Sequence, residues 1–219
     1  MEIQIRHSPS YAVARLFLAP NEPARIQSGA MVAHSAGVEI TAKAEGGILG
    51  GLKRSFLANE SFFTTTATAP AQGGWIDITN SLPGDVIVLP MTPDRPFFVT
   101  RGCWLANSWN VQTDTQFGGF QNLFGGEGGF GLRVFGDGQT VLGVHGALDV
   151  VDLAPGEAIT IDTGHVVAYD LNIQFQMRKA STGILNTLKS GEGFVFEFYG
   201  PGRIFMQSRA QPAVATTTA

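Results

Sequence analysis

The feature that most constrains the fold of this chain is a glycine-rich stretch that recurs. Its fullest copy, residues 123–138, reads LFGGEGGFGLRVFGDG. A second copy at residues 188–202 reads LKSGEGFVFEFYGPG, and a looser one at residues 52–63 reads LKRSFLANESFF. In the fullest copy, apolar residues alternate with others up to Gly136-Asp137-Gly138, which is a pattern of a strand that ends in a tight turn. We predict a β-hairpin here, with its turn at residues 136–138.

Two further markers recur in the same order along the chain. A glycine leads a short apolar strand at residues 28–33, 101–106 and 163–168. A turn that starts with proline and ends with an acidic residue occurs at residues 20–22, 83–85 and 155–157. Self-similarity of this kind indicates a fold made of repeated units.

The markers predict an all-β fold of three pseudo-symmetric repeats of short strands. We expect a β-sandwich or double-stranded β-helix-like architecture in one domain at residues 1–209. Its repeats are predicted at about residues 1–79, 80–152 and 153–209. Another short alternating run, residues 75–78, is expected to pair back on a threonine run at residues 64–68. From residue 210 the composition falls to alanine, threonine, proline and valine, so residues 210–219 are expected to be disordered.

Composition narrows the function classes. Charged residues make up 15% of the chain, the net charge is −4, and no block of basic residues occurs. Binding to nucleic acid through phosphate contacts therefore has little support. Cys103 is the single cysteine, and it is expected to be a small buried residue on a strand. No apolar run approaches the length of a transmembrane segment, so we expect a soluble intracellular protein.

No motif of an enzyme or a metal site is present. The four histidines, His7, His34, His145 and His165, do not have the spacing of metal ligands, and the sequence has no CxxC motif. His34 takes the repeat position of Asn107 and Tyr169, which suggests a tolerant edge position. A phosphate-binding loop and a nucleophile elbow are also absent. The chain is therefore expected to have no catalytic residues, no metal ligands and no cofactor.

The three glutamates of the recurring stretch have two interpretations. Glu60, Glu127 and Glu192 could converge near a pseudo-threefold axis and bind a cation or a basic partner. Alternatively, each carboxylate accepts hydrogen bonds from its own turn. We favour the structural role, because three converging carboxylates would repel one another unless a cation lay between them.

Apolar loops precede the three glutamates and are the candidate interaction loops. Their bulky residues are Ile48, Leu49 and Leu52; Phe117, Phe120, Leu123 and Phe124; and Ile184, Leu185 and Leu188. One interpretation is that they fold inward and plug the ends of the core. The other is that they project together from one end and form an apolar surface for self-association or for a membrane-bound partner.

Together, several segments resemble the altered-inheritance-of-mitochondria family. They are GAMVAHSAGVEI, GGILGGLKRSFLANESFF, PGDVIVL, NLFGGEGGFGLRVFGDG, DTGHVVAYDLNIQFQ and GEGFVFEFYGPGRIFMQSR. The resemblance runs from about Pro20 to Arg209. It implies an all-β fold similar to the subunits of the tryptophan RNA-binding attenuation protein. Mitochondrial members of the family are linked to inner-membrane organisation. The resemblance assigns no activity and no functional residues.

Two function classes remain open at this point. The first is a non-catalytic scaffold or interaction protein, acting through protein partners, through a membrane-associated complex or as a homo-oligomer. The alternative is an RNA- or small-ligand-binding module. A continuous basic stripe over Lys43, Lys53, Arg54, Arg178, Lys179 and Lys189 would favour RNA. With no presequence recognisable, we expect a bacterial or archaeal cytoplasmic protein that is either free or peripheral to the membrane.

Overall fold

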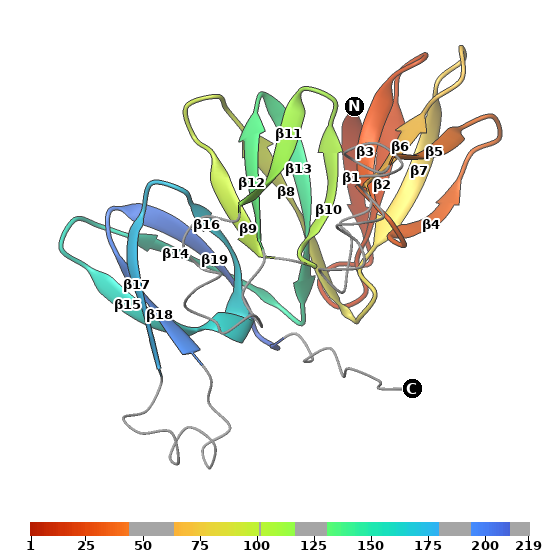
Figure 1. Ribbon diagram of the computed structural model, residues 1–219. Coiled ribbons are helices and arrows are strands. Elements are labelled where there is room, and N and C mark those ends of the chain that lie inside the picture. Colours follow the sequence, from red (N-terminus) through yellow and green to blue (C-terminus); the bar gives the residue numbers. More distant parts are fainter. Residues whose placement is uncertain (44–63, 101, 117–130, 180–193, 211–219) are drawn as a thin grey trace, which may run out of the picture.

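The protein is built from short antiparallel β-strands, as the sequence predicts (Figure 1). The computed structural model describes residues 1–43, 64–100, 102–116, 131–179 and 194–210. Strand β1 (Glu2–Arg6) precedes three successive sets of six strands. The first set is β2 (Val13–Leu18), β3 (Pro23–Gln27), β4 (Met31–His34), β5 (Glu39–Lys43), β6 (Thr64–Thr68) and β7 (Gly74–Thr79).

The other two sets follow without a break in this pattern. The second is β8 (Gly84–Met91), β9 (Phe97–Thr100), β10 (Trp104–Ser108), β11 (Val111–Gln116), β12 (Gly131–Gly136) and β13 (Gly138–His145). The third is β14 (Leu148–Leu153), β15 (Ala158–Asp162), β16 (Val166–Asp170), β17 (Gln174–Lys179), β18 (Phe194–Tyr199) and β19 (Gly202–Gln207). A 3-10 helix, η1 (Thr163–His165), lies between β15 and β16.

Each set pairs its strands in the same way. The first strand of a set pairs with the sixth, as in β2–β7, β8–β13 and β14–β19. The third strand also pairs with the sixth, and the second and fifth strands pair with each other. The fourth pairs with the fifth. Each set therefore contributes two groups of three strands, which belong to different sheets.

The sets are joined by strand pairing between neighbours. β10 of the second set pairs with β3 of the first, and β16 of the third pairs with β9 of the second. Two six-stranded sheets result, β5-β6-β3-β10-β13-β8 and β11-β12-β9-β16-β19-β14. The remaining strands form the N-terminal end sheet, β1-β2-β7-β4, and the C-terminal end sheet, β15-β18-β17. In Figure 1 the three sets lie side by side, with the two end sheets at opposite ends of the molecule.

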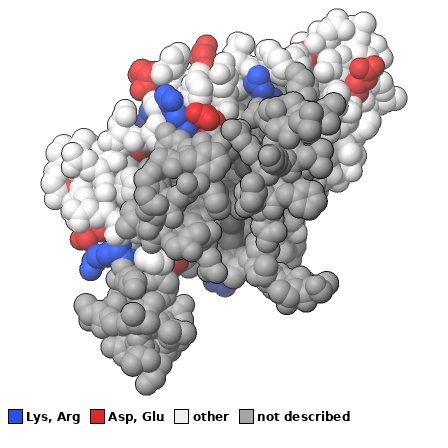
Figure 2. All heavy atoms as spheres, viewed as in Figure 1, with Lys and Arg blue, Asp and Glu red and all other residues white. Residues whose placement is uncertain are grey.

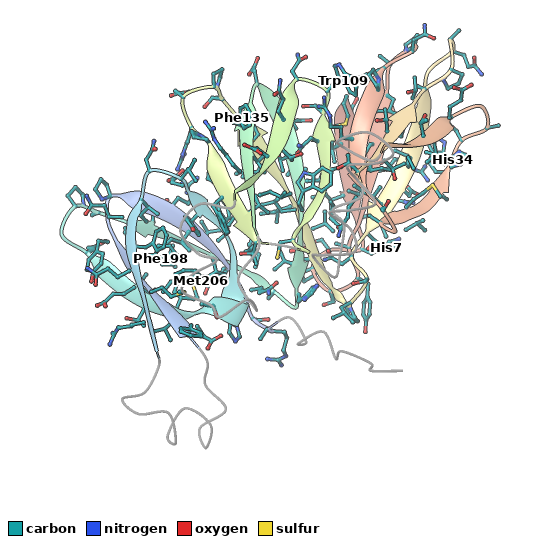
Figure 3. All side chains as sticks on the ribbon, viewed as in Figure 1. His7, His34, Trp109, Phe135, Phe198 and Met206 are labelled. Carbon is teal, nitrogen blue, oxygen red and sulfur yellow. The ribbon has the colours of Figure 1, made fainter. Side chains whose placement is uncertain are left out.

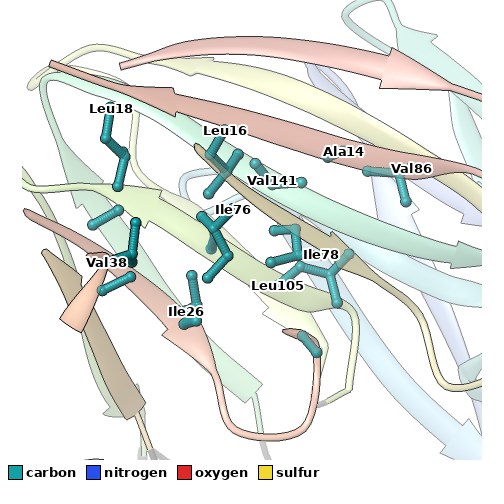
Figure 4. Packing of buried hydrophobic residues seen from close by; sticks show 14 of the residues in the cluster. Ala14, Leu16, Leu18, Ile26, Val38, Ile76, Ile78, Val86, Leu105 and Val141 are labelled. Carbon is teal, nitrogen blue, oxygen red and sulfur yellow. The ribbon is translucent and has the colours of Figure 1, made fainter. Parts of the chain in front are cut away.

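The hydrophobic core crosses the boundary between sets. On β2, Ala14, Leu16 and Leu18 point inward and are buried, whereas Phe17 is partly exposed. This alternation is what a strand with one buried face requires. The same cluster also contains Leu105 and other residues of the second set (Figure 4). Apolar burial therefore stabilises the contact between sets as well as each set itself.

The expected hairpin at residues 131–145 is a corner between two sheets. Asp137 alone separates β12 from β13, but β12 pairs with β9 and β11, whereas β13 pairs with β8 and β10. Gly136 and Gly138 have φ values of 121° and 141°, which only glycine adopts readily. These values let the chain leave one sheet and enter the other at once. Gly136 and Gly138 therefore mark a sharp turn, as predicted. The predicted pairing of the two strands that flank the turn was wrong.

The same applies to the link between β6 and β7, which were also expected to pair. β6 pairs with β3 and β5, and β7 pairs with β2 and β4.

One of the turn markers was also matched wrongly. Residues 20–22 and 155–157 lead into β3 and β15, whereas residues 83–85 lead into β8, which holds the place of β2 and β14. The turn at residues 92–95, which precedes β9, is the true counterpart.

Candidate interaction surface

The candidate interaction loops and the three glutamates lie outside the described residues. This applies to Ile48, Leu49, Leu52, Phe117, Phe120, Leu123, Phe124, Ile184, Leu185, Leu188, Glu60, Glu127 and Glu192. The strands on either side of each loop are described. They form the hairpins β5–β6, β11–β12 and β17–β18, which hold the same place in the three sets. Both interpretations of the loops and of the glutamates remain predictions. Most of the predicted tail, residues 211–219, is also outside the described residues.

The histidines are in separate environments. His7 and His34 are exposed, and His34 lies on β4 at the outer end of the molecule (Figure 3). His165 places its Nδ1 2.7 Å from the carbonyl oxygen of Gln207. His145 is buried, and burial lowers the pKa of its imidazole. Within the described ranges, no group of three or more His, Cys, Asp or Glu side chains is arranged to hold a metal ion.

Most basic side chains of the described residues are engaged by carboxylates. Arg15 donates from Nε and Nη2 to the two oxygens of Asp77, both at 2.8 Å, and Arg6 donates to the same carboxylate at 2.6 Å. The hydrogen bonds from Arg15 lower the pKa of Asp77. Three further ion pairs are Arg95–Asp170, Arg203–Asp152 and Arg178–Glu197. On the face shown in Figure 2, the charged side chains are scattered and several basic ones lie beside acidic ones.

The clearest exposed feature of the described residues is the outer edge of β4. Met31 is 44% exposed and Val32 is 55% exposed, and Ala33 and His34 are also exposed. β4 pairs with β7 on one side and, among the described residues, with no strand on the other. An edge of this kind presents unpaired backbone N–H and C=O groups. We refer to Met31–His34 with this open side as the β4 edge.

The counterparts of the β4 edge in the other sets are buried. All three strands have a register shift in their pairing with the last strand of the set: between Met31 and Ala33, between Trp104 and Ala106, and between Val166 and Ala168. The shift aligns Val32 with Leu105 and Val167, which are 1% and 0% exposed. Those two strands are covered because β10 pairs with β3 and β16 with β9. The β4 edge has the same apolar character, but in the part of the chain that the structure describes no strand covers it.

The exposure of the β4 edge could not be read from the sequence. The glycine-led marker matches residues 28–33 with 101–106 and 163–168, and this match equates Val32 with Leu105 and Val167. The match does not show that β10 and β16 are each covered by a strand of the preceding set. Among the described residues, no strand pairs with the outer side of β4, so a strand of buried type is left open there.

None of the described helical segments is long and apolar enough to cross a membrane.

A solved structure resembles this chain over nearly its whole length. The crystal structure of a Streptococcus pyogenes protein matches with a TM-score of 0.81 and 26% sequence identity, covering 95% of this chain and 94% of that one.

Two sequence comparisons agree with that likeness. An uncharacterised protein of Streptococcus pyogenes serotype M6 is 26% identical over 216 residues, which is 95% of this chain and 86% of the relative. A family model described as mitochondrial biogenesis AIM24 matches residues 3–209, which include every described strand except the first residue of β1. The chain therefore belongs to the AIM24 family.

Proposed function

We propose that this chain is a non-catalytic interaction protein that binds an extended protein segment along the β4 edge. The observation that carries the proposal is the contrast between Val32, 55% exposed, and its counterparts Leu105 and Val167, which are buried under a paired strand. A strand added at an open sheet edge gains backbone hydrogen bonds, and side-chain pockets select its sequence. Among the described residues, the β4 edge has an unpaired side for such a strand and exposed apolar side chains that it could contact.

The chemistry of β4 favours protein over nucleic acid. Its residues are Met31, Val32, Ala33 and His34, with no lysine or arginine among them. The side chain of Arg178 is the only one of the proposed basic stripe that the structure describes, and it pairs with Glu197 at 3.1 Å. With a net charge of −4, the alternative of an RNA-binding module has less support. A membrane-associated partner is part of the proposal, and it rests on the resemblance to family members linked to inner-membrane organisation.

The proposal is tested by a charge placed on the β4 edge. Val32→Glu adds a carboxylate that a paired strand would bury without a partner, so binding should be lost. Val150→Glu is a matched control, because Val150 is 42% exposed on β14, which is also an edge strand. Affinity purification from the native host identifies proteins that the wild-type chain and Val150→Glu retain and Val32→Glu loses. Calorimetry with the purified partner then measures binding. Equal affinity of all three chains would contradict the proposal.

A further inference from the structure

We infer that the β4 edge binds the β15 edge of a second copy of this chain, so that copies join head to tail. This inference rests on the proposed function, since it names the partner of the same edge. Its starting point is that the chain already contains the proposed contact twice. The third strand of one set pairs antiparallel with the second strand of the preceding set in both β10–β3 and β16–β9.

The two internal contacts share one register. In the first, the opposed pairs are Ala106↔Ile26, Asn107↔Arg25 and Ser108↔Ala24. In the second, they are Ala168↔Val99, Tyr169↔Phe98 and Asp170↔Phe97. The alanine that follows the register shift lies opposite a β-branched residue in both. A repeated register indicates a defined contact geometry, because a slip by one residue would turn each side chain to the other face.

The two end sheets are complementary halves of the six-stranded sheet. The order β11-β12-β9-β16-β19-β14 contains the fourth, fifth and second strands of one set followed by the third, sixth and first strands of the next. The C-terminal end sheet supplies the first half as β17-β18-β15, and the N-terminal end sheet supplies the second half as β4-β7-β2, with β1 beyond. Joining β15 to β4 would therefore reproduce the order of the internal sheets.

A single chain cannot make this contact with itself in the described structure. The two end sheets lie at opposite ends of the molecule, with the second set between them (Figure 1). The occupant of each open edge is therefore expected to come from another copy. A contact between two different surfaces of identical chains gives a ring when its rotation closes, and an open filament when it does not.

The expected register follows from the two internal contacts. Ala33 has the place of Ala106 and Ala168, and Ile161 has the place of Ile26 and Val99, judged by their pairing within each set. Ala33 of one copy should therefore lie opposite Ile161 of the next, and His34 opposite Thr160. His34 and Thr160 are both exposed in the single chain. Their internal counterparts Tyr169 and Phe98 stack on each other with ring centroids 4.8 Å apart.

The distribution of charge at the sheet edges supports this choice of edges. Proteins often protect an exposed edge strand with charged residues or proline. The six other edge strands carry such residues: Glu2 and Arg6 on β1, Glu39 and Lys43 on β5, Asp85 and Pro90 on β8, Asp114 on β11, Asp149 and Asp152 on β14, and Arg178 and Lys179 on β17. β4 has no acidic, lysine, arginine or proline residue, and β15 has only Asp162 at its last position. Among the described edge strands, β4 is therefore the one without an acidic, lysine, arginine or proline residue, and on β15 the single acidic residue lies at the end of the strand.

Cross-linking tests the partner and the register together. One chain carries His34→Cys and a second carries Thr160→Cys, and both changes are at exposed positions that should leave the fold intact. Directly opposed residues of an antiparallel pair have Cβ atoms about 4.5–5.5 Å apart, within reach of a short thiol cross-linker. We expect a covalent dimer in the mixture and none from either variant alone. The wild-type chain gives the background from Cys103, which is 0% exposed.

Sedimentation velocity of the purified chain measures the assembly itself. The wild type and Val150→Glu should form species larger than a dimer as concentration rises, and Val32→Glu should weaken self-association by at least about 100-fold. Cross-linking of His34→Cys with itself would overturn the inference in favour of a symmetric contact. A wild-type chain that stays monomeric and does not cross-link would also overturn it. In that case, a different protein that binds the wild type and not Val32→Glu would still support the proposed function. If no protein is lost by Val32→Glu, both the proposed function and the self-association are contradicted.

Discussion

Phe98 and Tyr169 stack on each other across the contact between the second and third sets, with ring centroids 4.8 Å apart and planes inclined by 20°. They are directly opposed in the β9–β16 pairing, and both are buried. Tyr169 also lies against the rings of Phe175, Phe196 and Phe198 of the third set. One side chain therefore connects the pairing between sets with the core of the C-terminal end sheet.

Replacing Phe98 with alanine should destabilise the fold by about 3–5 kcal/mol, because it leaves a cavity beside Tyr169. Urea unfolding measures this change. Phe17→Ala is the control, since Phe17 is 37% exposed on β2 and its loss should cost much less. Equal effects of the two changes would show that the stacked pair does not stabilise the contact between sets.

The carboxylate of Asp77 should make stability depend on pH. The hydrogen bonds from Arg15 hold the pKa of Asp77 below its ordinary value in the folded chain. A lowered pKa contributes stability that is present above the unfolded pKa, about 3.9, and is lost as the pH falls through the folded value. Asp77→Asn should therefore be less stable than wild type at pH 7, with the difference shrinking in acid. Urea unfolding of both chains across that pH range measures the convergence, and a difference that stays constant would contradict the role of Asp77.

The imidazole of His145 should also make the folded chain less stable in acid, but in a higher pH range than Asp77. Burial lowers the pKa of His145, so the folded chain favours the neutral ring. As the pH falls below about 6.5, the unfolded chain takes up this proton more readily, and the folded chain loses stability. His145→Asn should remove that part of the pH dependence between pH 7 and pH 5. NMR titration of the wild-type histidines should show one that protonates below the ordinary range, and its absence would contradict the assignment.

The corner at Gly138 should not tolerate a side chain. Gly138 has a φ of 141°, and an added Cβ would overlap the Oγ of Ser108. Gly138→Ala should lower the free energy of unfolding by more than the ~1 kcal/mol that the backbone conformation costs alone. Gly29→Ala isolates the conformational part, because Gly29 also has positive φ but no atom lies within 4 Å of the added Cβ. Thermal unfolding of both variants gives the comparison, and equal losses would show that the overlap is relieved.

Local patterns predicted the strands of this fold but not their partners. The alternation of Ala14, Leu16 and Leu18 with polar or exposed residues reports which face of β2 is buried, and it does so without knowledge of the rest of the chain. Gly136 and Gly138 report a reversal of the chain in the same local way. Whether β13 then pairs with β12 or with β8 is decided by packing between segments far apart in sequence, which short-range spacing does not encode.

The candidate surface was harder to predict than the fold. Met31 and Val32 have the sequence of a buried strand, and they are exposed because none of the described strands pairs with the outer side of β4. The sequence instead predicted the apolar loops at residues 46–52, 117–124 and 183–188 as the interaction surface, and these loops lie outside the described residues. Edge strands can be identified only when the order of strands in every sheet is known.

Shared sheets also limit how this chain could be shortened. A cut between β7 and β8 would leave β3 without β10, and it would remove Leu105, Val86 and Val141 from the cluster around Ile26. The first set alone would then present β3 as an open edge beside its existing β4 edge. The first set therefore needs β10 of the second set to cover β3. A truncated chain would exchange this internal strand pairing for association between molecules.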